Sequence, residues 1–225
     1  MQDKVIVITG ATGALGKLTA RTFAETGASL ALLDNDQGKL DSLVEELKLP
    51  EERLFASVVD LRDGDAVRDS AEAVSKKFGV EGIHGLIHLV GGWVGGKTLS
   101  ETPIEDFENM LGQHVWTTFH LFRAYSPKLA KSGWGRVITI SPSTTSNPPA
   151  ERGVYTATKT AQETLMLTLA EELKEYGVTA NIIQVHAIDV EDKGKGATPK
   201  VIVAAMQYLF SDQAGKVNGA RIPLY

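Results

Sequence analysis

Short apolar runs alternate with longer amphipathic stretches along the whole chain. The runs are rich in β-branched residues and apolar along their full length, which is typical of strands covered on both faces. They predict strands at Lys4–Thr9, Ser29–Asp34, Leu54–Val59, Gly85–Val90, Arg136–Ser141, Thr179–Val185 and Ala220–Pro223. The amphipathic stretches predict helices at Leu15–Thr26, Gln37–Leu47, Asp65–Phe78, Ile104–Lys131, Val154–Tyr176 and Lys200–Phe210.

This alternation predicts a single doubly wound α/β domain of the Rossmann type over residues 1–225. We expect about seven mostly parallel strands with helices on both faces. Gly27, Gly79 and Gly177 closely follow predicted helices, as helix C-terminal caps do. The one irregular stretch, His186–Pro199, is rich in charges and is interpreted as a solvated surface loop.

Composition narrows the class of protein. The 225 residues carry 23 Lys and Arg against 28 Asp and Glu, a net charge of -5, which argues against a binder of nucleic acid or anionic membranes. Cysteine is absent, so disulfides, thiolate metal sites and a cysteine nucleophile are excluded. No apolar run approaches the ~20 residues of a membrane span, and the first residues have no signal-peptide layout. We therefore expect a cytoplasmic protein.

A glycine-rich segment, Thr9–Gly16, joins the first predicted strand to the first predicted helix. Glycines at such a junction let backbone N–H groups approach a pyrophosphate, which the helix N-terminus stabilises. Asp34 ends the second strand, where a carboxylate accepts hydrogen bonds from the adenosine ribose and repels a 2′-phosphate. The structural alternatives are a plain turn and a carboxylate that caps the next helix. We interpret the two features together as a dinucleotide site.

The chain resembles the short-chain dehydrogenase/reductase family from about Lys4 to Val185. The family's Thr-Gly-x-x-x-(Gly/Ala)-x-Gly loop matches Thr9, Gly10, Ala14 and Gly16, and Gly13 completes the Gly-x-x-Gly-x-x-Gly spacing of its extended and atypical branches. The resemblance implies cofactor contacts by this loop, by the segment after the third strand and by the turn after the fourth. Together with Asp34 these residues are Gly10, Thr12, Gly13, Ala14, Leu15, Gly16, Asp60, Leu61, Gly91 and Gly92.

The turn after the fourth strand departs from the family. Leu89-Val90-Gly91-Gly92 stands where the family has Asn-Asn-Ala-Gly, so only a backbone role along the cofactor carries over. Asp60 and the glycine pair are alternatively a strand terminator and an ordinary turn.

Tyr155 and Lys159 match the family's Tyr-x-x-x-Lys. Residues four apart share a helix face, so the ammonium can lie beside the phenol. Two unit charges ~5 Å apart at an effective dielectric of ~20 interact by roughly 3 kcal/mol, which lowers the pKa of a phenol by about two units. The resemblance implies that Tyr155 exchanges a proton with the substrate oxygen and that both residues contact the cofactor, Lys159 at its nicotinamide ribose. A surface helix pair is the structural alternative.

Two further positions of the family's catalytic set are altered. The serine falls on Pro142, which has no side-chain donor. Ser143 or Ser141 takes its role if the loop shifts by one residue, and we prefer Ser143 because a strand-terminal Pro142 turns the next residue into the pocket. Turn chemistry is the alternative for both serines. His114 replaces the helix asparagine and either hydrogen-bonds a water or a backbone carbonyl in its place or is a satisfied core histidine.

The last third of the chain also differs. Val185-His186 replaces the family's Pro-Gly, and the short loop that follows predicts an open pocket. His84 and His88 have no third ligand nearby, so we interpret them as packing or hydrogen-bonding residues and predict no metal site. The resemblance further implies a homodimer or homotetramer built on the helices at Ile104–Lys131 and Val154–Tyr176.

The leading hypothesis is an oxidoreductase that transfers a hydride between a nicotinamide dinucleotide and a small-molecule carbonyl or alcohol. NAD(H) is expected over NADP(H), because Asn35 rather than Arg or Lys follows Asp34. An alternative within the family is a dihydropteridine-reductase-like enzyme, which keeps Tyr-x-x-x-Lys and dispenses with the serine. An alternative of another class is a non-catalytic dinucleotide-binding regulatory protein. The altered family positions favour it, and the intact Tyr155 and Lys159 pair opposes it.

Overall fold

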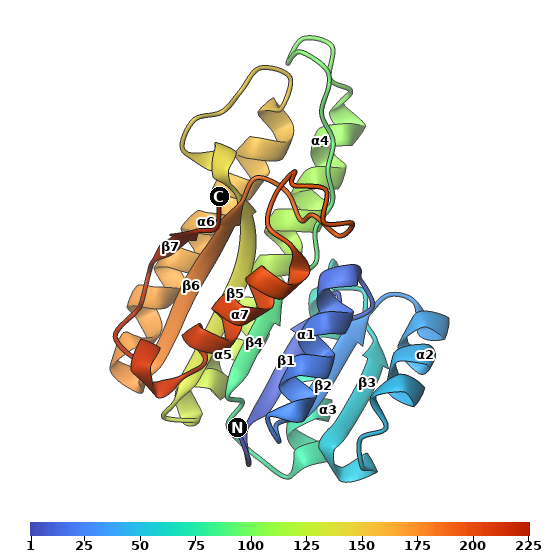
Figure 1. The fold of residues 1–225 in the computed structure, drawn as a ribbon, viewed down its shortest axis with the longest axis vertical. Coiled ribbons are helices and arrows are strands. Elements are labelled where there is room, and N and C mark those ends of the chain that lie inside the picture. Colours follow the sequence, from blue (N-terminus) through green and yellow to red (C-terminus); the bar gives the residue numbers. More distant parts are fainter.

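A seven-stranded sheet forms the centre of the computed structural model, which describes all of residues 1–225 (Figure 1). Its strands are β1 (Val5–Thr9), β2 (Ser29–Asp34), β3 (Leu54–Val58), β4 (Gly85–His88), β5 (Gly135–Pro142), β6 (Val178–Val185) and β7 (Arg221–Pro223). Their order is β3-β2-β1-β4-β5-β6-β7, and every neighbouring pair is parallel. This confirms the predicted doubly wound sheet, whose order reverses at β1.

Helices cover both faces of the sheet. They are α1 (Ala14–Glu25), α2 (Gln37–Leu47), α3 (Gly64–Phe78), α4 (Ile104–Met110), α5 (Thr117–Lys131), α6 (Gly153–Leu173) and α7 (Pro199–Leu209). One hydrophobic cluster joins the sheet to α3, α5 and α6, and a second joins its other face to α1, α2 and α7. None of these helices combines the length and the apolar character needed to cross a membrane.

The two clusters explain why the strands are apolar along their length. In β1, Val5 and Val7 belong to one cluster, whereas Ile6 and Ile8 belong to the other. Successive side chains of a strand point to opposite faces, and both faces of this sheet are covered. All four residues are therefore buried.

The helix predicted at Ile104–Lys131 is interrupted, which corrects that prediction. A π-helical segment, Leu111–Trp116, lies between α4 and α5. The Thr117 and Thr118 hydroxyls donate to the carbonyl oxygens of Gln113 and His114, both at 2.6 Å, so side chains satisfy acceptors in this segment. Hydrophobic periodicity does not distinguish a single wide turn from a regular helix, and such turns are frequent at functional sites.

Candidate active site

Two adjoining cavities open at the carboxyl ends of the strands. Their volumes are about 460 Å³ and about 650 Å³, and both are lined by Gly10, Gly13, Leu89, Val90 and Gly91. The predicted site residues that line the first cavity are Gly10, Gly13, Ala14, Leu15, Gly16, Gly91, Gly92, Ser141, Tyr155 and Lys159. The second cavity shares only Gly10, Gly13 and Gly91 of these, and four further predicted site residues line it: Thr12, Asp34, Asp60 and Leu61. Ser143 and His114 line neither cavity.

The loop between β1 and α1 requires its glycines. Gly10 has a φ of +68°, in the left-handed region, and a Cβ on Gly16 would lie 2.2 Å from the carbonyl oxygen of Gly10. Gly13 is the N-cap residue of α1 and offers no side-chain acceptor to the first turn. The N–H groups of that turn have no intrahelical partner and border the first cavity. This cradle fits an anionic diphosphate group.

Asp34 fixes the loop rather than the next helix. Its Oδ2 accepts a hydrogen bond from the Thr12 N–H at 2.9 Å, and its Oδ1 accepts one from the Asn35 N–H at 2.8 Å. The cap of α2 is Asp36, whose carboxylate accepts from the Lys39 N–H at 3.0 Å. The capping alternative for Asp34 is therefore wrong.

Tyr155 and Lys159 both line the first cavity from the start of α6. Burial lowers the pKa of Lys159 to about 8, with the Glu163 charge opposing this effect. The ammonium donates to the Ile140 carbonyl oxygen at 3.1 Å and to Gln162 Oε1 at 2.8 Å. Burial raises the pKa of Tyr155, and the Arg152 charge lowers it only in part. The expected lowering of the phenol pKa by Lys159 is thus not found, because desolvation outweighs charge attraction and Lys159 is bonded elsewhere.

His114 is a fully buried residue of the π-helical segment. Its Nδ1 lies 2.9 Å from Thr158 Oγ1, and this hydroxyl also lies 3.0 Å from the carbonyl oxygens of Val154 and Tyr155. Its Nε2 lies 3.2 Å from the Gly92 nitrogen and 3.1 Å from the Gly92 carbonyl oxygen, so the imidazole is held between Thr158 and the backbone of Gly92. Burial, helped by the Lys159 charge, lowers the pKa of His114 to about 3. Its neutral ring packs edge-on against the Tyr155 ring, with centroids 5.6 Å apart.

The serine loop differs from the expectation that Pro142 turns Ser143 into the pocket. Ser141 and Pro142 line the first cavity, and the Ser141 hydroxyl is buried with no hydrogen-bond partner. Ser143 begins a 3₁₀ turn, Ser143–Thr145, because β5 continues one residue further than predicted. The turn brings the Ser143 hydroxyl to 2.6 Å from His186 Nδ1. Ser143 thus contacts a residue of the cavity wall instead of forming it.

Sequence reasoning missed His88 and His186 as parts of the cavity wall. His88 ends β4 with its Nδ1 2.7 Å from Thr9 Oγ1, and its Nε2 is buried without a partner. Burial, together with the Lys159 charge, lowers the pKa of His88 to about 3. The replacement of the family's Pro-Gly by Val185-His186 could have indicated that His186 lies at the cavity. No sequence motif marks His88.

The stretch after β6 is mostly exposed, as a surface loop is, but it also contributes to the site. Ile188 and Val190 line the first cavity, as does Trp93. Asp189 holds the loop together because its Oδ2 accepts from the Lys195 N–H at 2.9 Å. No group of three or more His, Cys, Asp or Glu side chains is placed to hold a metal ion.

The chain is similar in sequence and in fold to several known proteins. A family model described as short chain dehydrogenase matches residues 4–198. The 7alpha-hydroxysteroid dehydrogenase of Escherichia coli strain K12 is 27% identical over 208 residues, covering 92% of this chain and 80% of that protein. The meso-2,3-butanediol dehydrogenase of Serratia marcescens is 30% identical over 241 residues, covering 99% and 93%. The structure of a short-chain type dehydrogenase/reductase from Mycobacterium ulcerans has a TM-score of 0.89 at 24% identity, covering 100% of this chain and 89% of that one.

The two buried histidines predict an acid-sensitive fold. Their pKa values are about 3 in the folded protein and ~6.5 in an unfolded chain, so only the unfolded chain binds these protons between those values. Their stabilising contribution is complete above pH ~6.5 and is lost as the pH falls towards 3, by up to about 1.4 kcal/mol per pH unit for each histidine. Urea unfolding between pH 7 and pH 4 measures the slope. His114→Asn should remove the contribution of one histidine to the slope of the unfolding free energy against pH. An unchanged slope in this variant would contradict the lowered pKa of His114.

Proposed function

Because the chain belongs to the short-chain dehydrogenase/reductase family, whose members are oxidoreductases that bind a nicotinamide dinucleotide, we propose that it transfers a hydride between NAD(H) and a small-molecule carbonyl or alcohol. The observation that carries the proposal is that Tyr155, Lys159 and the glycine loop border one cavity. A regulatory protein without catalysis would have no need to keep this pair facing the same space.

The glycine cradle and Asp34 fit the cofactor. The free N–H groups of the first turn of α1 would hold the diphosphate, and Asp34 and Asp60 line the cavity suited to the adenosine half. Lys159 would hold the nicotinamide ribose. When bound, the nicotinamide supplies or accepts the hydride.

Tyr155 supports a reduction at neutral pH. Because burial raises its pKa, the phenol carries its proton and can give it to a carbonyl oxygen as that oxygen gains negative charge. Trp93, Pro142 and Ile188 line the same cavity as the phenol and give it partly apolar walls. The reverse reaction requires the phenolate and should therefore accelerate as the pH rises.

Tyr155→Phe tests this role. The substitution removes the proton with little change of shape, so turnover should fall by ~10²–10⁴ while NADH binding persists. Steady-state kinetics with a panel of carbonyl compounds and quinonoid pterins, and calorimetry with NADH, measure the two effects. Lys159→Ala is the companion variant and should impair both. A Tyr155→Phe protein with wild-type turnover would refute the mechanism.

The serines distinguish two versions of the reaction. We propose that one of the two serines is the carbonyl donor: Ser141 lines the cavity of Tyr155, whereas Ser143, preferred from the sequence, lies behind the cavity wall at His186. Loss of the working donor should lower the rate by ~10²–10³. Kinetics of Ser143→Ala and Ser141→Ala, measured side by side, identify it. Full activity in both variants favours the second candidate function, a dihydropteridine-reductase-like enzyme. Pro142 at the family's serine position supports this candidate.

Asp34 should set the cofactor preference for NAD(H) over NADP(H). Its carboxylate repels a 2′-phosphate, and Asn35 beside it offers no positive charge. Asp34→Ala should weaken NADH binding and narrow the difference between NADH and NADPH. Calorimetry with both cofactors measures this change. Tighter binding of NADPH than of NADH by the wild-type protein would overturn the assignment.

We also propose a homodimer or homotetramer built on α4, α5 and α6. Four large apolar side chains of α4, α5 and the π-helical segment are left partly exposed, which an interface would cover: Ile104, Phe107, Trp116 and Phe119. Sedimentation velocity that finds only the monomer at working concentration would count against this assembly.

A further inference from the structure

Glu163 is a buried carboxylate that the reaction proposed above does not use. It lies in α6 four residues after Lys159, and its side chain is 1% exposed. A carboxylate removed from water to this extent needs compensating charge and hydrogen bonds to remain ionised. Its partners therefore show what the residue is built to hold.

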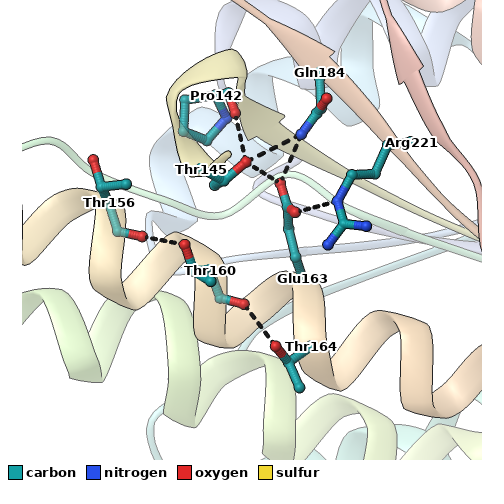
Figure 2. Close-up of polar contacts among 8 residues, drawn as sticks. All are labelled: Pro142, Thr145, Thr156, Thr160, Glu163, Thr164, Gln184 and Arg221. Carbon is teal, nitrogen blue, oxygen red and sulfur yellow. Dashed lines mark hydrogen bonds and ion pairs between the residues drawn. The ribbon is translucent and has the colours of Figure 1, made fainter. Parts of the chain in front are cut away.

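Figure 2 shows that these partners come from three other segments of the chain. Oε2 of Glu163 accepts from Arg221 Nε of β7 at 2.6 Å. Oε1 accepts from the Thr145 hydroxyl at 2.9 Å and from Gln184 Nε2 of β6 at 3.1 Å. The Thr145 oxygen also lies 3.2 Å from the carbonyl oxygen of Pro142. One carboxylate thus joins α6 to the serine loop and to both strands at this edge of the sheet.

The carboxylate is ionised at neutral pH. Burial raises the pKa of Glu163, but the nearby Ser141 hydroxyl and the hydrogen bonds from Arg221, Gln184 and Thr145 together outweigh burial and lower it. The Ser141 hydroxyl contributes by proximity, since it makes no hydrogen bond of normal geometry. Glu163 therefore brings a fixed negative charge to the helix that carries Tyr155 and Lys159.

Lys159 has few other groups that could balance its charge. It faces the Ile140 carbonyl oxygen of β5 and the Gln162 amide, which are neutral acceptors. His88 of β4 and His114 of the π-helical segment are uncharged at neutral pH, because each has a pKa of about 3. Glu163 is the carboxylate whose charge favours the ammonium form of Lys159.

We propose that Glu163 is a positioning residue for the catalytic pair: its carboxylate holds the Pro142–Thr145 turn against α6 and supplies a negative charge that favours the ammonium form of Lys159. The proposal rests on the proposed function only in that it assigns Lys159 a part in the reaction. It adds a buried residue that touches neither cavity to the groups on which the chemistry depends.

A titration of Lys159 tests the charge directly and needs no substrate. Lysine labelled with ¹³C at Cε is incorporated, and the Lys159 signal is assigned by its loss in Lys159→Arg. In Glu163→Gln the pKa of Lys159 should fall by at least half a unit from about 8, because the opposing negative charge is gone. Glu163→Asp is the matched control: it keeps a carboxylate at this position, so the pKa of Lys159 should stay near the wild-type value. Equal Lys159 pKa values in Glu163→Gln and the wild type would overturn the proposal.

The double variant Glu163→Gln/Arg221→Gln guards against a folding failure. It replaces the ion pair by two amides and should show the same lowered pKa of Lys159, whereas an unchanged value would count against the proposal.

Kinetics then test the link to catalysis. With any carbonyl substrate that the wild type reduces, the alkaline limit of the pH–rate profile should move to lower pH in Glu163→Gln, by the shift seen in the titration. Glu163→Asp, which restores the charge, should recover most of this shift. Thr145→Val removes the tether to the serine loop and should lower kcat without moving the pKa of Lys159. A profile that stays in place while the Lys159 titration shifts refutes the catalytic part, and a wild type without turnover refutes the proposed reaction but not the charge effect.

Discussion

Enclosing an ammonium group in protein is the constraint on which the candidate active site depends. Lys159 has lost almost all contact with water, so each neighbour must offer an acceptor or remain uncharged. The acceptors come from β5 and from the same helix, and neutral imidazoles come from β4 and the π-helical segment. The sheet, the π-helical segment and α6 must therefore pack in one fixed arrangement around Lys159.

The altered family positions are connected to one another through this enclosure. The turn after β4 has lost the side-chain amides of the family pattern, but the backbone of Gly92 lies within hydrogen-bond distance of the His114 imidazole. A Cβ on Gly91 would lie 3.5 Å from both Lys159 Nζ and His114 Nε2. A Cβ on Gly92 would lie 1.8 Å from Gln113 Oε1, so the second glycine of the pair is the one that this packing requires.

The strands were predictable to within about two residues because burial on both faces leaves uninterrupted apolar runs. The glycine loop and Asp34 were predictable because backbone geometry restricts which residues occupy such a turn. The position of Ser143 could not be predicted from the sequence, because it depends on a 3₁₀ turn and on a contact with the distant residue His186. The direction of the Tyr155 pKa was also missed, because helical spacing reports proximity to a charge and not the loss of water.

The strand order has a consequence for how the chain folds during synthesis. The central strand β1 pairs on one side with β2 and on the other with β4, where Thr9 meets its partner His88 across 79 residues of sequence. At ~5–20 residues per second, a ribosome takes roughly 4–16 s to make that interval. During this time the far side of an almost entirely apolar strand presents unpaired N–H and C=O groups, which are a template for association with other chains. The strand that carries the glycine-rich loop is therefore also an unpaired edge of the nascent chain until β4 has been made.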